Sequence, residues 1–135
     1  MKRFLFDTGI AGMYISRIAN IRERSMEEAA RGNRIGISLI NLAELYYGVE
    51  NSTTKEKNLK RLTAHLQHFT IWPFTQAAAR EFGRLATILK KIGRPMQQID
   101  IMIAAVAMTI PHCTVVTRDT DLSAVPGLSV ENWAG

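Results

Sequence analysis

Three carboxylates in this sequence lie where a charge is costly. Asp7, Glu44 and Asp100 are each embedded among apolar residues. A buried carboxylate is unfavourable unless it is paired, protonated or bound to a metal ion. Asp119 and Asp121 follow a short apolar segment near the C-terminus and could join them. Together the five acids predict a site for a hard cation.

The remaining glutamates differ from these acids, because they stand among polar or basic neighbours and are typical of solvated helix faces. They are Glu23, Glu27, Glu28, Glu50, Glu56 and Glu81. Mg²⁺ and Mn²⁺ prefer oxygen ligands, and the sequence has no His/Cys set with zinc spacing. His65 and His68 are expected near solvent on a helix. Cys113, beside an apolar strand, is expected in the core rather than as a nucleophile.

Each acid also has a purely structural interpretation. Asp7 could cap the helix that follows it, a role compatible with metal binding. Glu44 could be an exposed residue at the margin of an apolar helix stripe, and Asp100 a satisfied core aspartate. Asp119 and Asp121 could belong to an ordinary turn after a strand. Thr8 and Thr117 are candidate supporting residues, since a hydroxyl beside a carboxylate can hydrogen-bond it.

The chain is basic, with a net charge of +5 and a pI of about 9.7. This charge favours a nucleic acid or an acidic protein as partner. Arg118 stands beside the C-terminal acids. Lys55, Lys57, Lys60 and Arg61 lie on one predicted helix. These five residues are candidates for contacts with an RNA backbone, although the helix could equally present a solvated charged face.

Strand-like and helix-like segments alternate along the chain, which predicts an α/β fold with a parallel sheet covered on both faces. Strands are predicted at Arg3–Phe6, Ile35–Ser38, Phe69–Trp72 and Thr114–Thr117, with a short fifth after Gly127. Helices are predicted from Thr8 to about Gly32 with a break near Ala19-Asn20, over Leu39–Val49, Lys55–Gln67 and Thr75–Ile92, and from Met96 to about Thr109. Sites in such sheets lie beyond the carboxyl ends of the strands, where Asp7 and Asp119 stand.

The length of 135 residues predicts a single domain spanning 1–135. No apolar stretch is long enough for a transmembrane helix, and Asp7 interrupts the first apolar run after three residues. The single cysteine cannot form an internal disulfide. A soluble, cytoplasmic protein is therefore expected.

Four ordered motifs resemble those of the PIN-domain family, and within it the VapC-type toxins of toxin–antitoxin pairs. They are Lys2–Thr8, Ser38–Gly48, Gly93–Ala105 and Val115–Asp119, the last followed by Val125–Leu128 and Val130–Trp133. The family usually has Asn two residues after the first Asp, and here that position is Gly9. A polar group that could position the first acid or the substrate is therefore missing.

The resemblance implies a three-layer α/β/α PIN-like fold with a central parallel sheet of four to five strands. It implies that Asp7, Glu44, Asp100 and Asp119 form the catalytic and metal-binding cluster, with Asp121 a possible fifth acid. It also implies Mg²⁺- or Mn²⁺-dependent cleavage of RNA, a homodimer, and a VapB-like antitoxin that covers the site. Without bound metal, the crowded carboxylates should have raised pKa values.

Apolar stripes on two helices predict where a dimer would form. One stripe comprises Ala78, Phe82, Leu85, Ala86 and Leu89, and the other comprises Leu42, Leu45 and Tyr46. One sheet face can cover only part of this area, so some of it is expected in a two-fold interface. The alternative is that all of it packs internally.

Other classes of protein fit less well. Asp7-Thr8-Gly9 matches the aspartic-protease signature, but such proteases are almost entirely β. A phosphatase of the haloacid-dehalogenase type would need a second Asp at position 9. A non-catalytic or solitary PIN-like RNA-binding module remains the main alternative, although it would not require a full set of buried carboxylates.

Overall fold

The computed structural model describes all residues 1–135 as five strands and six α-helices with one short 3-10 helix. The strands are β1 (Arg3–Phe6), β2 (Arg34–Ser38), β3 (Thr70–Trp72), β4 (Cys113–Val116) and β5 (Ser129–Glu131). The helices are α1 (Thr8–Ser16), α2 (Ile21–Ala30), α3 (Leu39–Glu50), α4 (Lys55–Leu66), α5 (Gln76–Lys91) and α6 (Gln98–Met108), and the 3-10 helix is η1 (Thr120–Ala124). The predicted break near Ala19-Asn20 and the fifth strand after Gly127 are confirmed.

The strands form one sheet in the order β3-β2-β1-β4-β5, and every neighbouring pair is parallel. All strands therefore end at the same edge. β1 and β4 are adjacent at the centre, with Phe6 opposite Val116, so the residues that follow these two strands start side by side. This is the edge at which the sequence places Asp7 and Asp119.

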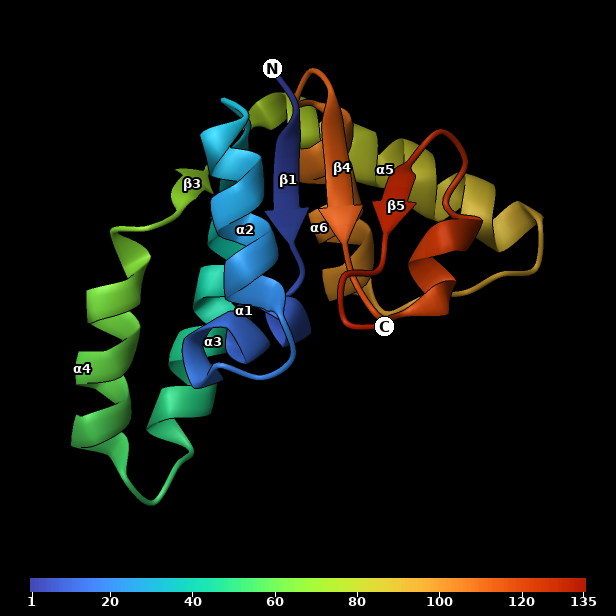
Figure 1. The fold of residues 1–135 in the computed structure, drawn as a ribbon. Coiled ribbons are helices and arrows are strands. Elements are labelled where there is room, and N and C mark those ends of the chain that lie inside the picture. Colours follow the sequence, from blue (N-terminus) through green and yellow to red (C-terminus); the bar gives the residue numbers. More distant parts are fainter.

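Two apolar cores lie on opposite faces of the sheet, because consecutive strand residues point to opposite sides. Phe4 and Phe6 pack with residues of α1 and α2 on one face. Leu5 packs with α5 and α6 on the other. Figure 1 shows the resulting three layers, with α2 to the left of β1 and α1 below it on the near side of the sheet, and with α5 and α6 behind the sheet. The predicted three-layer α/β/α fold is confirmed.

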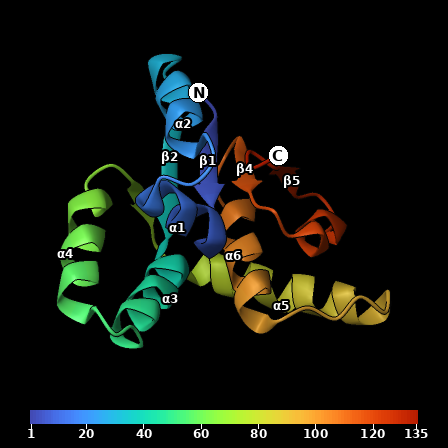
Figure 2. The same ribbon diagram turned by 60° about the horizontal axis from the view of Figure 1, so that its bottom comes forward.

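The helices α3 and α4 form an arm that extends beyond the carboxyl ends of the strands. Figure 2 brings this end of the sheet forward and shows α1, α3 and α6 gathered around the end of β1, with α4 outside α3. No helix of the protein combines the length and the apolar character that a membrane span requires. The helix α6 begins at Gln98 rather than at the predicted Met96, because Gln97 has an extended backbone and is the N-cap of the helix.

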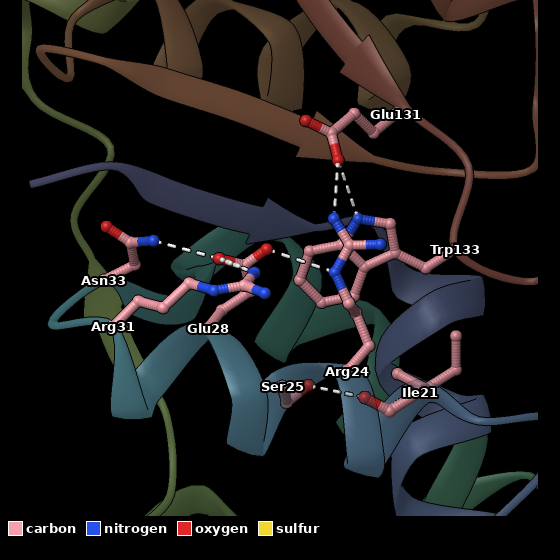
Figure 3. A network of polar contacts seen from close by, with 8 residues as sticks. All are labelled: Ile21, Arg24, Ser25, Glu28, Arg31, Asn33, Glu131 and Trp133. Atoms are coloured by element: carbon pink, nitrogen blue, oxygen red, sulfur yellow. Dashed lines mark hydrogen bonds and ion pairs between the residues drawn. The ribbon is translucent and has the colours of Figure 1, made fainter.

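The expectation that Glu28 lies on a solvated helix face is wrong. Glu28 is only 4% exposed. Its carboxylate accepts hydrogen bonds from Arg24 and Asn33 and forms ion pairs with Arg24 and Arg31. Figure 3 shows how Arg24 extends this network to Glu131. These partners, with the hydrogen bonds they donate, hold the pKa of Glu28 below its ordinary value despite burial.

The Arg24 guanidinium also lies over the ring of Trp133, 4.7 Å from its centroid. The indole N–H of Trp133 donates to the same carboxylate of Glu131. This contact, visible in Figure 3, ties the C-terminal segment to α2 across the face of the sheet. None of the side-chain hydrogen bonds and ion pairs of this network involves the five acids described next.

The apolar stripe on α5 packs mostly inside the protein. Ala78, Leu85 and Leu89 are buried in the core that α5 shares with α6, so this part of the stripe is internal and any dimer interface would use the rest of the apolar area. Phe82 and Ala86 are half-buried beside the same core. On α3 the large apolar side chains that remain exposed are Leu39, Tyr46 and Tyr47, which are 46%, 40% and 72% exposed.

Candidate active site

Asp7 and Asp119 meet at the carboxyl ends of the two central strands. The Asp7 carboxylate accepts the backbone N–H of Ile10 at 2.9 Å, so it caps α1 as expected. Its other oxygen accepts the hydroxyl of Thr117. The backbone N–H of Asp119 donates to that same Thr117 oxygen at 2.8 Å. Thr117 is 2% exposed, and its hydroxyl joins the two acids. This contact agrees with the prediction that Thr117 hydrogen-bonds the carboxylates.

Glu44 reaches the site from the second turn of α3. Its Oε1 accepts the hydroxyl of Thr8, whose oxygen in turn accepts the Asn41 side-chain N–H at 3.2 Å. Asn41 is oriented by Ser38, which donates both its hydroxyl (2.7 Å) and its backbone N–H (2.8 Å) to Asn41 Oδ1. A relay of four polar side chains thus connects the end of β2 to Glu44.

Ser38 and Asn41 were not predicted as site residues. Both are completely buried. They form a capping box at the start of α3, in which Asn41 replaces the usual Glu or Gln. The available signal was a polar Asn inside an otherwise apolar run directly after a strand, because a buried amide needs fixed partners.

Asp100 lies in the first turn of α6 and faces a cleft of about 540 Å³. The cleft is lined by Pro95, Met96, Gln97, Asp100, Asp119 and Asp121. Asp119 caps η1 through a hydrogen bond from the Asp121 backbone N–H at 2.9 Å, so the turn reading of this pair is also correct. The structure therefore brings Asp100 and the two C-terminal acids to one opening.

The electrostatics confirm that the acids crowd together. Burial raises the pKa of the Asp7 carboxyl above its ordinary value, with a further contribution from the charge of Asp119, although the Thr117 hydroxyl and the Ile10 N–H act in the opposite direction. The pKa of Asp100 is also raised, first by burial and then by Asp119, Glu44, Asp7 and Asp121 in that order. The raised pKa values expected of a metal-free cluster are confirmed for these two residues.

No cation of the protein neutralises the cluster. The ion pairs of the structure use Glu28, Glu50, Glu81 and Glu131, and none uses the five acids. No three of the side chains are arranged to hold one metal ion directly. The donor set consists of carboxylate oxygens, which suits Mg²⁺, an ion that is commonly bound by one or two carboxylates and keeps several of its waters. The residues therefore fit a hydrated hard cation.

The predicted RNA-binding residues are divided. Arg61 lines a hollow of about 320 Å³ that also contains Thr8 and Glu44, so it lies next to the acids. Arg118 is exposed, and its guanidinium contacts the sulfur of Met13 on α1. Lys55 pairs with Glu50. Lys57 and Lys60 are exposed on α4 and line neither hollow of the site, as in the alternative interpretation of that helix.

Two further positions bear on the chemistry. Burial raises the pKa of the Cys113 thiol to about 12, so this residue is not a thiolate nucleophile at neutral pH. At Gly9, a Cβ atom would lie 3.7 Å from Asp7 Oδ1, which is an ordinary contact. A side chain at this position would therefore have room beside Asp7.

A parallel sheet with uncompensated carboxylates along its carboxyl edge defines the class of domain. Residues 4–128 match the model of the PIN domain. The chain is 33% identical to ribonuclease VapC2 of Rickettsia felis, over 96% of this chain and 97% of that protein. It is 30% identical to the tRNA(fMet)-specific endonuclease VapC of Shigella flexneri, over 99% of this chain and all of that protein.

Solved structures agree with this likeness. The structure of VapBC2 from Rickettsia felis bound to a promoter DNA fragment matches with a TM-score of 0.89 and 32% identity, over 97% of this chain and 98% of that one. The structure of DNA-bound VapBC from Salmonella typhimurium matches with a TM-score of 0.89 and 30% identity, over 98% of this chain and 99% of that one. The chain belongs to the PIN-domain family, and within that family to the VapC-type ribonucleases.

Proposed function

We propose that this protein is the toxin of a type II toxin–antitoxin pair and that it hydrolyses RNA phosphodiester bonds with Mg²⁺ or Mn²⁺. The observation that carries the proposal is the cluster of five acids without a positive partner at the carboxyl ends of β1 and β4. These charges are costly for the fold, as the raised pKa values of Asp7 and Asp100 indicate; burial is the first cause for both residues, and neighbouring acids add to it. A bound cation would compensate these charges, so the unfavourable energy of the metal-free site favours metal binding.

The acidic residues would then have different roles in metal binding and cleavage. Asp7 and Asp100 are the first choice as direct ligands, and Glu44 and Asp119 ligate, hold waters or act as base, with Asp121 at the rim. A bound Mg²⁺ or Mn²⁺ would lower the pKa of a water and neutralise charge on the phosphoryl and leaving oxygens. Asp7 is kept in one orientation by its hydrogen bonds from Ile10 and Thr117.

Glu44 is oriented through the hydroxyl of Thr8, so its carboxylate is fixed before substrate arrives. Arg61 lines the hollow that contains Glu44, and the exposed Arg118 precedes Asp119 in sequence. Both are suited to hold the RNA backbone, because guanidinium groups bind phosphate oxygens well. The net charge of +5 supports the same substrate class.

We further propose a cognate VapB-like antitoxin as partner. The matching structures from Rickettsia felis and Salmonella typhimurium are VapBC assemblies, which supports this proposal. The antitoxin would present a cation such as Arg to the carboxylates and thereby displace the metal or block water. A short neighbouring gene that encodes a small DNA-binding protein would be consistent with this assignment.

The test is Asp100→Asn, with Glu56→Gln on the exposed face of α4 as a control that also removes one negative charge. Asparagine keeps the shape and loses the charge that binds the cation. Cleavage of a mixed RNA substrate with Mg²⁺ or Mn²⁺ should fall by at least about 100-fold for Asp100→Asn and stay unchanged for Glu56→Gln. Full activity of Asp100→Asn would rule out Asp100 as a principal ligand.

Stability supplies an independent readout. The folded-state pKa of Asp100 is raised, so ionisation of this residue destabilises the metal-free fold at neutral pH. Asp100→Asn should therefore raise the free energy of unfolding at pH 7, and this gain should shrink as the pH falls toward 3.8, the ordinary value for aspartate. Wild-type protein that binds RNA without any metal-dependent cleavage would instead favour the non-catalytic RNA-binding module.

A further inference from the structure

A second hollow, of about 330 Å³, lies beside the site hollow that contains Thr8 and Glu44. It is lined by Ile15, Ser16, Arg17, Arg22, Arg61 and His65. Three of these residues, Ile15, Ser16 and Arg61, also line the site hollow. The two hollows are therefore neighbours along α1, in the region where Figure 2 shows α1, α3 and α4 next to one another.

The second hollow carries positive charge that no carboxylate offsets. Arg17, Arg22 and Arg61 form no ion pair, since the basic residues that do are Arg24, Arg31, Lys55 and Arg84. Arg22 is held rigidly by hydrogen bonds to the carbonyl oxygens of Tyr14 (2.7 Å) and Ile15 (3.1 Å). Like charges gathered in this way repel one another, and an anion bound among them would remove that repulsion.

His65 lines the same hollow and contacts Arg22. The Arg22 guanidinium lies 3.1 Å from His65 Nε2, and because a guanidinium can only donate, Nε2 accepts and the ring proton is on Nδ1. His65 lies on α4 and is half-buried, and its Nδ1 atom is buried without a hydrogen-bond partner. Burial and then the neighbouring cations hold the pKa of His65 below its ordinary value, so the ring is neutral and the charge belongs to the arginines.

The backbone at Arg17 gives separate support. This residue ends α1 with φ of +55°, in the left-handed region that favours glycine. An arginine in this conformation costs conformational energy. Because its side chain lines the second hollow, we take the cost as an indication that the side chain has a function there. Glycine should be accepted here without loss of the fold.

We propose that Arg17, Arg22 and Arg61 bind a backbone phosphate of the RNA at a distance from the phosphate that is cut. This inference rests on the proposed nuclease function. Thr8 and Ser16 are separated by about 12 Å along α1 at 1.5 Å per residue, which is more than one nucleotide. Because the two hollows are neighbours, an RNA chain that is cut at the acids can extend directly into the second hollow. This arrangement favours RNA over an acidic protein segment.

The test compares Arg17→Gly and Arg61→Gln with Arg80→Gln, an exposed arginine on α5 that forms no ion pair. Binding of a fluorescent 12-nucleotide single-stranded RNA is measured in EDTA, in the Asp100→Asn background, so that no cleavage interferes. Each hollow variant should weaken binding about tenfold and lower the slope of log K against log salt by about 0.7 per lost phosphate contact. Arg80→Gln should change the affinity by less than twofold.

The length of the substrate gives the second readout, now with Asp100 intact and metal present. Arg17→Gly should lower kcat/KM about tenfold for the 12-nucleotide RNA and leave that of a dinucleotide, which cannot reach both hollows, unchanged. Equal losses for both substrates, or unchanged affinity for the long RNA, would overturn the proposal; the second result would assign the hollow to a protein partner. RNA binding that depends on the three arginines without any cleavage by the wild-type protein would refute the nuclease function and retain only the contact of the arginines with RNA.

Discussion

Thr117 offers a sharp test of how the site is held together. Its buried hydroxyl donates to Asp7 and accepts the backbone N–H of Asp119, so a single oxygen connects two of the acids. Thr117→Val replaces that hydroxyl with a methyl group of nearly the same shape. The substitution therefore removes both hydrogen bonds and changes the packing little.

The expected loss of stability follows from these two contacts. A hydrogen bond to a charged group contributes about 1.5–3 kcal/mol, and a buried donor left without an acceptor costs about 1–3 kcal/mol. The Asp119 residue is half-buried, so water can replace part of its lost contact. We expect Thr117→Val to lower the free energy of unfolding by about 2–3 kcal/mol at pH 7.5.

The loss should depend on pH in a defined direction. The Thr117 hydroxyl lowers the pKa of Asp7, so the valine variant raises that pKa beyond its already raised folded value. A carboxyl with a raised folded pKa destabilises the fold as the pH rises above its ordinary value of 3.8. The difference between variant and wild type should therefore be smallest near pH 4 and grow toward pH 7.5.

Urea unfolding of the metal-free protein at both pH values measures this difference. Thr114→Val is the matched control, because Thr114 lies in β4, the strand that directly precedes Thr117, and its hydroxyl contacts only the neutral Ser129 hydroxyl. That control should change stability by less than about 1 kcal/mol at either pH. A loss for Thr117→Val that is equal at pH 4 and pH 7.5 would refute the argument, since it would show that the Asp7 charge is not involved.

Two other predictions concern the second relay and the assembly. Thr8→Val removes the only hydroxyl donor to Glu44, so the rate of metal-dependent cleavage should fall about tenfold with a stability loss of about 1 kcal/mol; unchanged cleavage kinetics would exclude Glu44 orientation as a requirement. The protein should sediment as a dimer at micromolar concentration through the exposed α3 residues Leu39, Tyr46 and Tyr47, with an interface above about 1,200 Å². Tyr47→Glu should then yield a monomer, and a wild-type monomer across that range would defeat the dimer while leaving the nuclease proposal intact.

The order of elements and the position of the acids were predictable because both depend on local pattern. Short apolar runs that alternate with helical periodicity specify a parallel sheet, and the carboxyl ends of its strands must then share one edge. Asp7 and Asp119 directly follow two strands, so the fold alone brings them to that edge. Asp100 was recognisable because a helix that is apolar nearly all round leaves few other reasons for a carboxylate.

What escaped prediction depends on contacts between segments distant in sequence. Glu28 stands among polar neighbours, and its burial follows from the packing of α2 on the sheet. Its direct partners Arg24 and Asn33 are close in sequence, but Arg24 also contacts the distant Glu131. The second hollow, which Arg17, Arg22 and Arg61 line, also depends on segments distant in sequence, because it forms between the end of α1, the start of α2 and α4. A charged residue on a helix looks alike in sequence whether it faces solvent or another helix, so spacing alone could not separate these cases.

The hydrogen bonds within the site explain why the acids need not act alike. Thr117 and the Ile10 N–H serve Asp7, and Thr8 serves Glu44, so these two carboxylates have fixed donors in the metal-free protein. Asp100 has no such donor, and four acids raise its pKa in addition to burial. It is therefore the carboxylate whose charge is least compensated by the fold, and the one that gains most from a bound cation. The hydroxyl donors set the geometry of the site, whereas Asp100 supplies the uncompensated charge, so geometry and metal affinity should be separable by substitution.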